Sequence, residues 1–191
     1  MTKTWKMMAA AVPFVFAVAC TDAAKAPAEA AMTAAGAAVD SLKGEATRFA
    51  PSAVKAVEAS YATAKDLIAK QDYKGALAAA GDIPAKAKEA LAQAAAAKDA
   101  LVKAWADAGG SIPKMLEAAK SRLDILAQAK KLPAGMDKAA LAKAQGGLAS
   151  LQSGWTAASE QYKAGDWSGA IAKAKDLKAQ GMDLLKSIGL Q

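Results

Sequence analysis

The sequence predicts an all-α protein, and three observations support that prediction. First, 54% of the 191 residues are apolar but only 5% are aromatic. Most of the apolar excess is alanine, which has the highest intrinsic helix propensity. Second, glycine and proline are confined to short clusters. Third, between those clusters apolar residues recur at alternating spacings of three and four, the pattern of one helix face. Because an alanine-rich core buries little area per residue, we expect stability to come from closely packed helix–helix seams.

The first 19 residues have the pattern of a secretory signal peptide. Lys3 and Lys6 form a short basic region, and residues 7–19 are uncharged and apolar. That run is too short to cross a bilayer as a helix, which takes roughly 20 apolar residues. We therefore expect residues 1–19 to direct export and to be removed.

The end of this segment, Ala17-Val18-Ala19-Cys20, resembles the lipobox of bacterial lipoproteins, and Cys20 is the only cysteine in the chain. In that family a small residue precedes a cysteine that receives diacylglycerol and becomes the acylated mature N-terminus. The resemblance implies that Cys20 is the lipidation site, carrying acyl chains such as palmitate, and that Thr21 after it directs the protein to the outer membrane.

Two alternatives to lipidation remain. Ala17-Val18-Ala19 also fits an ordinary cleavage site, which would release a soluble periplasmic protein. A lone cysteine can also be a buried free thiol.

Residues 20–31 are predicted to form the lipid anchor and a flexible tether, because Pro27 interrupts an otherwise helix-prone run. Such a tether would hold the first helix about 20 Å from the anchor. Amphipathic stripes then cover 33–49 and 52–71. Pro51 stands between them, and the residue before a proline avoids the helical region. The two stripes can belong to separate helices or to one bent rod.

Longer helical patterns fill the rest of the chain, so we expect residues 32–191 to form a single all-helical domain. The stripes cover residues 73–108, 111–131, 136–162 and 167–188. Pro84 is predicted to kink the first of these helices. Ser111 is predicted to cap the second, which is the richest in branched apolar side chains and is therefore the predicted central helix.

Two ten-residue stretches, 68–77 and 162–171, repeat one pattern. Each is predicted to contain the end of one helix, a tight turn and the start of an antiparallel second helix. Asp72 and Asp166 stand at the N-cap position, where a carboxylate accepts a hydrogen bond from an unpaired N–H and opposes the helix dipole. We interpret the surrounding segments, about 53–108 and 136–188, as duplicated helical hairpins in an alanine-rich bundle.

Tyr73 and Trp167 follow the two caps, and Gly75 and Gly169 stand three positions after them. The pattern Asp-[Tyr/Trp] with a small residue beyond it, preceded by Gln71 in the first copy and by Gly165 in the second, resembles the turn between the two helices of tetratricopeptide repeats. The resemblance covers about ten residues in each copy and implies that the glycines let the first helix approach closely. Tetratricopeptide repeats recur every ~34 residues, whereas these two copies stand 94 positions apart. The resemblance therefore supports the hairpin geometry, and a short tetratricopeptide-like array is kept as an alternative to a simple bundle.

The chain offers few groups for catalysis. It has no histidine, and its one cysteine is the predicted lipidation site, so Ser–His, Cys–His and zinc constellations are excluded. We expect no enzymatic activity, no cofactor and no metal. Other carboxylates are expected to pair with lysines one helical turn away; they are Glu89, which faces Lys86, and Asp99, Glu117, Asp124 and Glu160. The methionines Met32, Met115, Met136 and Met182 are expected to pack in the core rather than to bind copper.

Three tryptophans allow two interpretations. Trp105, Trp155 and Trp167 fall at helical spacing, which favours a role in filling helix seams. The alternative is that they line a ligand groove.

The net charge of +7 becomes +5 once Lys3 and Lys6 are removed with the signal segment. Such a balance favours weak contact with anionic lipid or envelope polymers rather than with nucleic acid. We expect a non-enzymatic envelope lipoprotein of the outer membrane, held by its N-terminal lipid and facing the periplasm. Its helices are expected to act as a scaffold or protein-interaction module for another envelope protein. The alternative is a helical periplasmic protein that binds a small apolar or anionic ligand between its hairpins.

Overall fold

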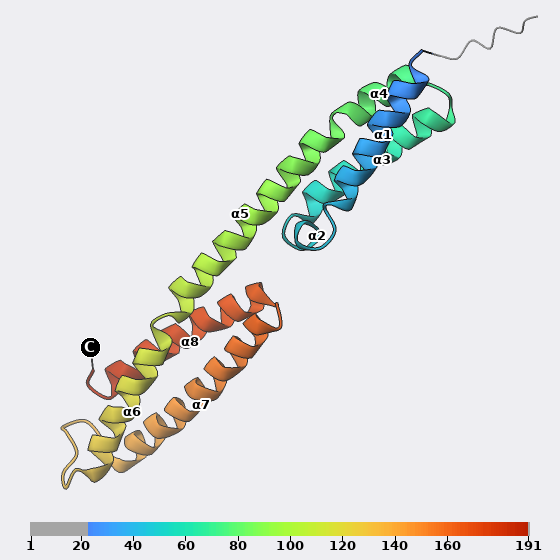
Figure 1. Ribbon diagram of the computed structural model, residues 1–191. Helices are drawn as coiled ribbons and strands as arrows, with labels where there is room; N and C mark the ends of the chain where they lie inside the picture. Colours follow the sequence, from blue (N-terminus) through green and yellow to red (C-terminus); the bar gives the residue numbers. More distant parts are fainter. Residues whose placement is uncertain (1–22, 191) are drawn as a thin grey trace, which may run out of the picture. The chain divides into compact units, whose positions relative to one another are not determined.

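The computed structural model describes residues 23–190, which are helical apart from short turns and one loop (Figure 1). This part of the chain contains eight α-helices and no strand, so the all-α prediction is confirmed. The helices are α1 (Lys25–Asp40), α2 (Glu45–Phe49), α3 (Pro51–Ala69), α4 (Tyr73–Gly81), α5 (Ile83–Gly109), α6 (Ile112–Gln128), α7 (Lys138–Lys163) and α8 (Trp167–Ser187).

These helices divide between two compact units. The first unit contains α1, α4, the part of α3 from Lys55 onward and the start of α5 up to Ala87. The second unit contains α2, the first residues of α3 up to Val54, the rest of α5, and α6 to α8. Within the single all-helical domain expected over 32–191, the contacts between residues group into these two units, and each is described by itself.

The core of the first unit is made mostly of alanine. In it α1 packs along α4. The fully enclosed residues of this unit are Ala28, Ala35, Val57, Ala64, Ala76, Ala80, Ile83 and Ala87. A methyl side chain lets two helix axes come close together. These contacts are the closely packed seams that the composition predicts.

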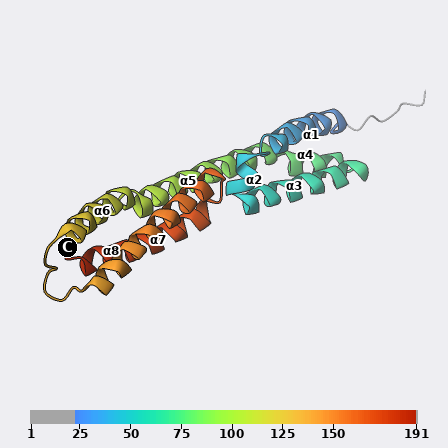
Figure 2. The same cartoon turned by 90° about the horizontal axis from the view of Figure 1, so that it is seen from below.

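In the second unit α6, α7 and α8 pack against one another, and α7 and α8 lie side by side in both views (Figures 1 and 2). The buried side chains form two clusters. The first cluster contains Ala108, Ile112, Leu151, Ala158, Ile171, Ala174 and Leu177. The second contains Ala119, Leu123, Leu126, Ala144, Leu148 and Ile188. Within each helix most of these residues recur at spacings of three, four or seven, as expected because the three–four periodicity marks the face that a helix buries.

The turn between α3 and α4 ends one helix and begins the next within three residues. Gln71 adopts a left-handed φ of 61°. Its N–H donates to the Ile68 carbonyl at 2.9 Å, and the N–H of Asp72 donates to the Leu67 carbonyl at 2.9 Å. This pair of bonds is the Schellman motif, which satisfies carbonyls at a helix C-terminus. Asp72 is also the N-cap of α4, because its Oδ1 accepts a hydrogen bond from the N–H of Gly75 at 2.9 Å.

The turn between α7 and α8 has the same structure. Gly165 is left-handed with φ 94°. Its N–H donates to the Tyr162 carbonyl at 3.0 Å, and the N–H of Asp166 donates to the Gln161 carbonyl at 3.1 Å. The N–H of Gly169 donates to Oδ1 of Asp166 at 3.0 Å. The two caps share φ −82° and have ψ 75° and 74°. The predicted caps are therefore confirmed, and the matching geometry supports the interpretation of a duplicated hairpin.

The two glycines after the caps do something other than what we predicted. We expected them to let the preceding helix approach. A Cβ atom at Gly75 would instead meet the carboxylate of Asp72, and one at Gly169 would meet the carboxylate of Asp166 and the amide of Gln161. Each glycine therefore leaves the space in which the capping carboxylate lies.

Helix α1 begins earlier than predicted. The tether expected over 20–31 is wrong from Lys25 onward, because residues 25–31 are already helical. Pro27 lies in the first turn of α1, where its missing N–H leaves no helical hydrogen bond unmade. Residues 20–22 lie outside the described part of the chain.

The predicted helix over 33–49 is interrupted. α1 ends at Asp40, and α2 begins at Glu45 after Gly44, whose φ is 95°. A left-handed residue ends a right-handed helix, so the segment cannot continue through it. The stripes over 33–49 and 52–71 are therefore not one bent rod.

Two further positions correct the prediction. α4 ends at Gly81 and α5 begins at Ile83, so Pro84 lies in the first turn of a new helix rather than at a kink. Ser111 precedes α6 as expected, but its side chain makes no capping hydrogen bond. Its own backbone is helical (φ −88°, ψ −17°), whereas a capping side chain needs an extended backbone.

No helix within residues 23–190 combines the length and the apolar character needed to cross a bilayer.

We predict that Gly169→Leu destabilises the second unit, because the new side chain displaces the carboxylate of Asp166 from its capping position. Gly146 is the matched control: it is an exposed α7 glycine where a Cβ atom would meet nothing within 4 Å. Gly146→Leu should stabilise the protein by about 0.5–1 kcal/mol, since leucine is the better helix former. Denaturant unfolding followed by tryptophan fluorescence measures the free energy of unfolding of both variants. If Gly169→Leu is as stabilising as Gly146→Leu, the cap does not occupy that space in solution.

Candidate functional site

The most distinctive cluster of side chains in the second unit is a row of five aromatic rings, here called the aromatic stack. Its members are Phe49 of α2, Trp105 of α5, Trp155 and Tyr162 of α7, and Trp167 of α8. All five are half-buried. The stack therefore joins four helices through ring contacts.

Trp105 inserts between two rings of α7. Its ring centroid lies 5.2 Å from that of Trp155 and 4.4 Å from that of Tyr162, with interplanar angles of 8° and 13°. Trp155 and Tyr162 are two helical turns apart, about 10 Å along the axis. The two distances show that Trp105 fills this gap and has a ring on each face.

Trp167 extends the row across the turn. Its ring lies 5.2 Å from Tyr162 at 21°, and 5.1 Å from Phe49 at 45°. A planar ligand or a sugar ring stacks on an open aromatic face. Because neighbouring rings cover both faces of Trp105 and of Tyr162, these two rings offer no open face to a ligand, which agrees with the predicted role of the tryptophans in filling helix seams.

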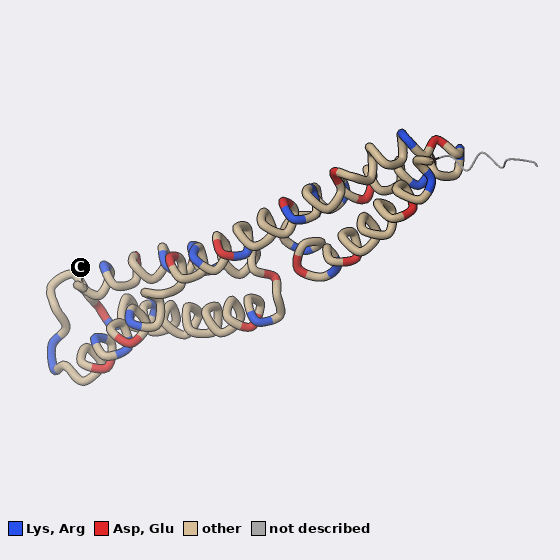
Figure 3. Tube along the Cα trace, turned by 45° about the horizontal axis from the view of Figure 1, so that its top comes forward, with Lys and Arg blue, Asp and Glu red and all other residues tan. Residues whose placement is uncertain are grey.

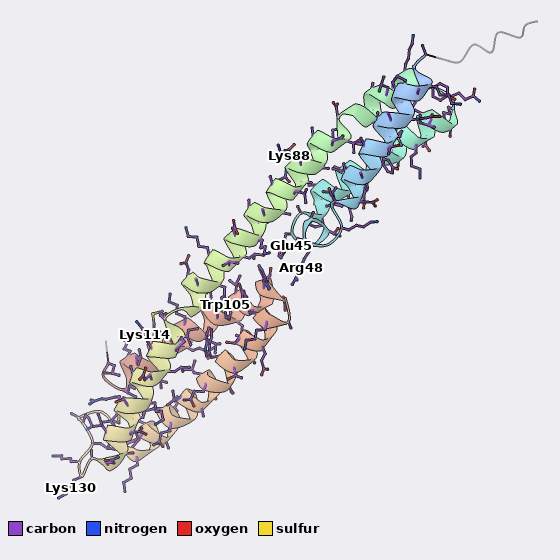
Figure 4. All side chains as sticks on the ribbon, in the orientation of Figure 1. Glu45, Arg48, Lys88, Trp105, Lys114 and Lys130 are labelled. Carbon is purple, nitrogen blue, oxygen red and sulfur yellow. The ribbon has the colours of Figure 1, made fainter. Side chains whose placement is uncertain are left out.

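Arg48 of α2 holds the turn at the end of the stack. Its guanidinium donates a hydrogen bond to the carbonyl of Gly165. The same group lies over the rings of Phe49 and Trp167, at 5.3 Å and 5.6 Å from their centroids. Figure 4 labels Arg48 and Trp105 on their helices. Arg48 was not among the predicted functional residues, and its only signal in the sequence is an Arg-Phe pair two positions before Pro51.

The capping carboxylate of α8 accepts one more hydrogen bond than the capping carboxylate of α4. The side-chain amide of Gln161 donates to the Asp166 carboxylate, and the backbone N–H of Gly169 donates to it as well. These two donors, the Gln161 amide first, hold the pKa of Asp166 below its usual value despite a small opposing effect of burial. The first turn has Leu67 at the position of Gln161, so Asp72 receives no such amide.

The candidate catalytic carboxylates are spread over three helices, and two of them, Glu117 and Asp124 of α6, line one surface hollow. Glu89, Asp99, Glu117, Asp124 and Glu160 are all exposed and lie on α5, α6 and α7. Asp124 pairs with Lys120 at 2.9 Å, as expected for residues one turn apart. Glu89 instead accepts a hydrogen bond from Gln93, which corrects the predicted partner Lys86. No group of three or more potential ligands among His, Cys, Asp and Glu lies close enough to hold a metal within residues 23–190.

Besides a hollow of about 440 Å³ on one face of α6, which Glu117, Lys120 and Asp124 help to line, two grooves between helices could hold a ligand. One, in the first unit, measures about 430 Å³ and lies between α1 and α3, with Met32, Tyr61 and Ile68 as its apolar lining. The other, in the second unit, measures about 360 Å³ and lies between α5 and α8, with Lys175 and Lys178 at its rim. No buried side-chain nitrogen or oxygen of the described residues lacks a partner. Neither groove therefore has a buried polar side-chain atom without a partner in its lining.

The predicted lipidation site, Cys20, lies outside the described residues.

The lowered pKa of Asp166 predicts a pH dependence. Because the folded-state pKa lies below the unfolded value of about 4, the charged carboxylate stabilises the fold above that pH. This contribution is lost as the pH falls through the folded-state pKa. Asp166→Asn keeps a good N-cap residue but does not titrate. In denaturant melts between pH 6 and 2.5, the wild type should lose its advantage over Asp166→Asn as the pH drops.

The variant Gln161→Leu, which copies the first turn, should shrink this pH-dependent advantage. An advantage of Asp over Asn that is equal at both ends of the pH range would contradict the assignment.

We predict that Arg48→Ala destabilises the second unit by about 1–2 kcal/mol, because it removes a charge-assisted hydrogen bond and a cation–π contact. It should also shift tryptophan emission to the red, since every tryptophan within residues 23–190 belongs to the stack. Lys163→Ala is the control, an exposed cation near the same turn. If Arg48→Ala and Lys163→Ala have the same free energy of unfolding, Arg48 acts only as a surface charge.

No protein-family model, curated protein or solved structure matches this chain, so its function has to be inferred from its own residues.

Proposed function

We propose that the protein is a lipid-anchored envelope protein whose helical hairpins act as a non-enzymatic scaffold or interaction module. The observation that carries this proposal is the position of Cys20. It is the only cysteine of the chain, and it follows directly on a basic start and a short apolar run.

The scaffold role is supported by what the described residues lack and by how they are packed. The catalytic candidates are dispersed and exposed. The aromatic rings, which could have formed a platform, are packed against one another. What the two units offer to other molecules is helical surface, which suits protein interaction better than chemistry on a small substrate.

A second candidate is a small-ligand-binding protein, favoured by the groove between α1 and α3. Its lining combines Met32, Tyr61 and Ile68 with the charged Glu29 and Lys65. Such a lining suits a small amphipathic molecule. Native mass spectrometry of protein released gently from the envelope separates the two candidates. A defined additional mass that disappears in Tyr61→Ala would support ligand binding, and a bare chain would support the scaffold.

We predict that Cys20→Ser moves the protein from the membrane fraction to the soluble fraction of cells, because the thiol that receives the lipid is gone. The wild type should sediment with membranes and carry the mass of acyl chains on its N-terminal cysteine. The measurement is fractionation with immunoblotting, together with mass spectrometry of the mature protein.

Cys20→Ala provides a second variant with the same expectation, and Ser41→Ala is a matched control at an exposed site. A wild-type protein that is soluble and has an unmodified thiol would mean that the chain is secreted without an anchor.

A further inference from the structure

The net charge of the protein lies in one of its two units. The described part of the first unit has six basic and six acidic residues and is therefore neutral. The described part of the second unit has 17 basic and 11 acidic residues, a net charge of +6. Electrostatic attraction to an anionic partner therefore comes from the second unit.

Within that unit, cations gather at one end of the bundle, here called the basic end. Residues 125–159 contain four lysines and a single acid, Asp137. The lysines are Lys130 and Lys131 after α6, and Lys138 and Lys143 in the first two turns of α7. Lys186, in the last turn of α8, adds a further cation. Figure 3 shows the basic residues on the loop that joins α6 to α7, and Figure 4 labels Lys130 there.

The charges of the basic end have no partners of their own. The five lysines are exposed, and none of their side chains forms an ion pair or hydrogen bond with another described residue. The carboxylate of Asp137 is engaged in capping α7, where it accepts a hydrogen bond from the N–H of Ala140 at 2.7 Å. Lys138 stands in the first turn of α7, at the positive end of the helix dipole, where a cation is unfavourable. The local potential is therefore strongly positive.

The shape of the basic end favours a flat anionic surface over a linear polymer. The lysines come from three elements that surround the tip of the bundle and do not form a row along a groove. Apolar residues stand among them: Leu132 and Pro133 follow Lys131 in the loop, and Ile125, in the last turn of α6, is 59% exposed. Lysine stems and such residues suit the boundary between headgroups and acyl chains.

We propose that the basic end docks on the anionic headgroups of a lipid bilayer and so provides a second membrane contact besides the N-terminal lipid. This inference rests on the proposed envelope location. A lipid anchor and a basic patch on the same protein hold it to a membrane more firmly than either alone. Near an anionic surface each lysine strengthens binding by about fivefold, so three of them account for roughly 100-fold.

The test uses the Cys20→Ser chain, so that binding does not depend on the lipid anchor. Co-sedimentation with vesicles of phosphatidylglycerol should show binding that falls as salt rises, because exposed charges are screened within about 10 Å at 0.1 M salt. Vesicles of phosphatidylcholine should bind little. The triple variant Lys130→Glu, Lys131→Glu, Lys138→Glu should lose about 100-fold in affinity. Far-UV circular dichroism should show it folded, since a glutamate at position 138 suits the start of α7.

The matched control is Lys55→Glu, Lys70→Glu, Lys74→Glu, which makes the same charge change at exposed sites of the neutral first unit. It should keep most of the vesicle affinity. Equal loss in both triple variants would overturn the proposal, because net charge alone would then govern binding. Equal binding to soluble polyglutamate would also overturn it, in favour of an acidic protein or polymer.

Membrane sedimentation of wild-type cells tests the anchor separately. Failure of the anchor and failure of the basic end therefore give different results.

Discussion

The constraint on which the hairpins depend is a turn in which one residue serves two helices. Asp72 and Asp166 each close the Schellman motif of the preceding helix through their N–H, and cap the following helix through their carboxylate. With no spare loop residues, the second helix must start beside the end of the first and run back along it. This antiparallel return brings Trp167 onto Tyr162, and it exposes the Gly165 carbonyl that Arg48 binds. The contact between Trp167 and Tyr162, one of those that make up the aromatic stack, is thus a consequence of the turn.

The two units use different means to hold their helices together. In the first unit the enclosed side chains are mostly methyl groups, so stability depends on how close the helices lie. In the second unit leucine and isoleucine form two clusters, and the aromatic stack ties α5 and α2 to the α7–α8 hairpin. A short helix such as α2 is marginal by itself. It is held here by Arg48 and by the ion pair between Glu45 and Lys98 of α5.

The two units differ in net charge, and therefore in how they can attract a charged partner over a distance. A neutral first unit has no long-range preference, so a partner that docks there must be chosen by shape and apolar contact. The second unit is cationic, and its cations cluster where they have no internal partners. Unpaired surface charge adds little to fold stability. Its placement therefore matters for encounters with anionic surfaces, and this is why the basic end, rather than the aromatic seam, is the surface of interest.

The helical class, the positions of the two capped turns and nearly all of the buried faces of α6, α7 and α8 could be predicted from the sequence alone. These are local properties: propensity, a three–four period and an N-cap pattern each act within a few residues. Three features depend on tertiary contacts: the division into two units, the hydrogen bond of Arg48 to Gly165, and the covering of both faces of Trp105 by the rings of Trp155 and Tyr162. Tertiary contacts also decide that Leu91, although on the predicted stripe, is 39% exposed, while Ala90 beside it is buried. In each case the partner lies far away in the chain or comes from another helix, and a periodic pattern identifies an apolar face but not what covers it.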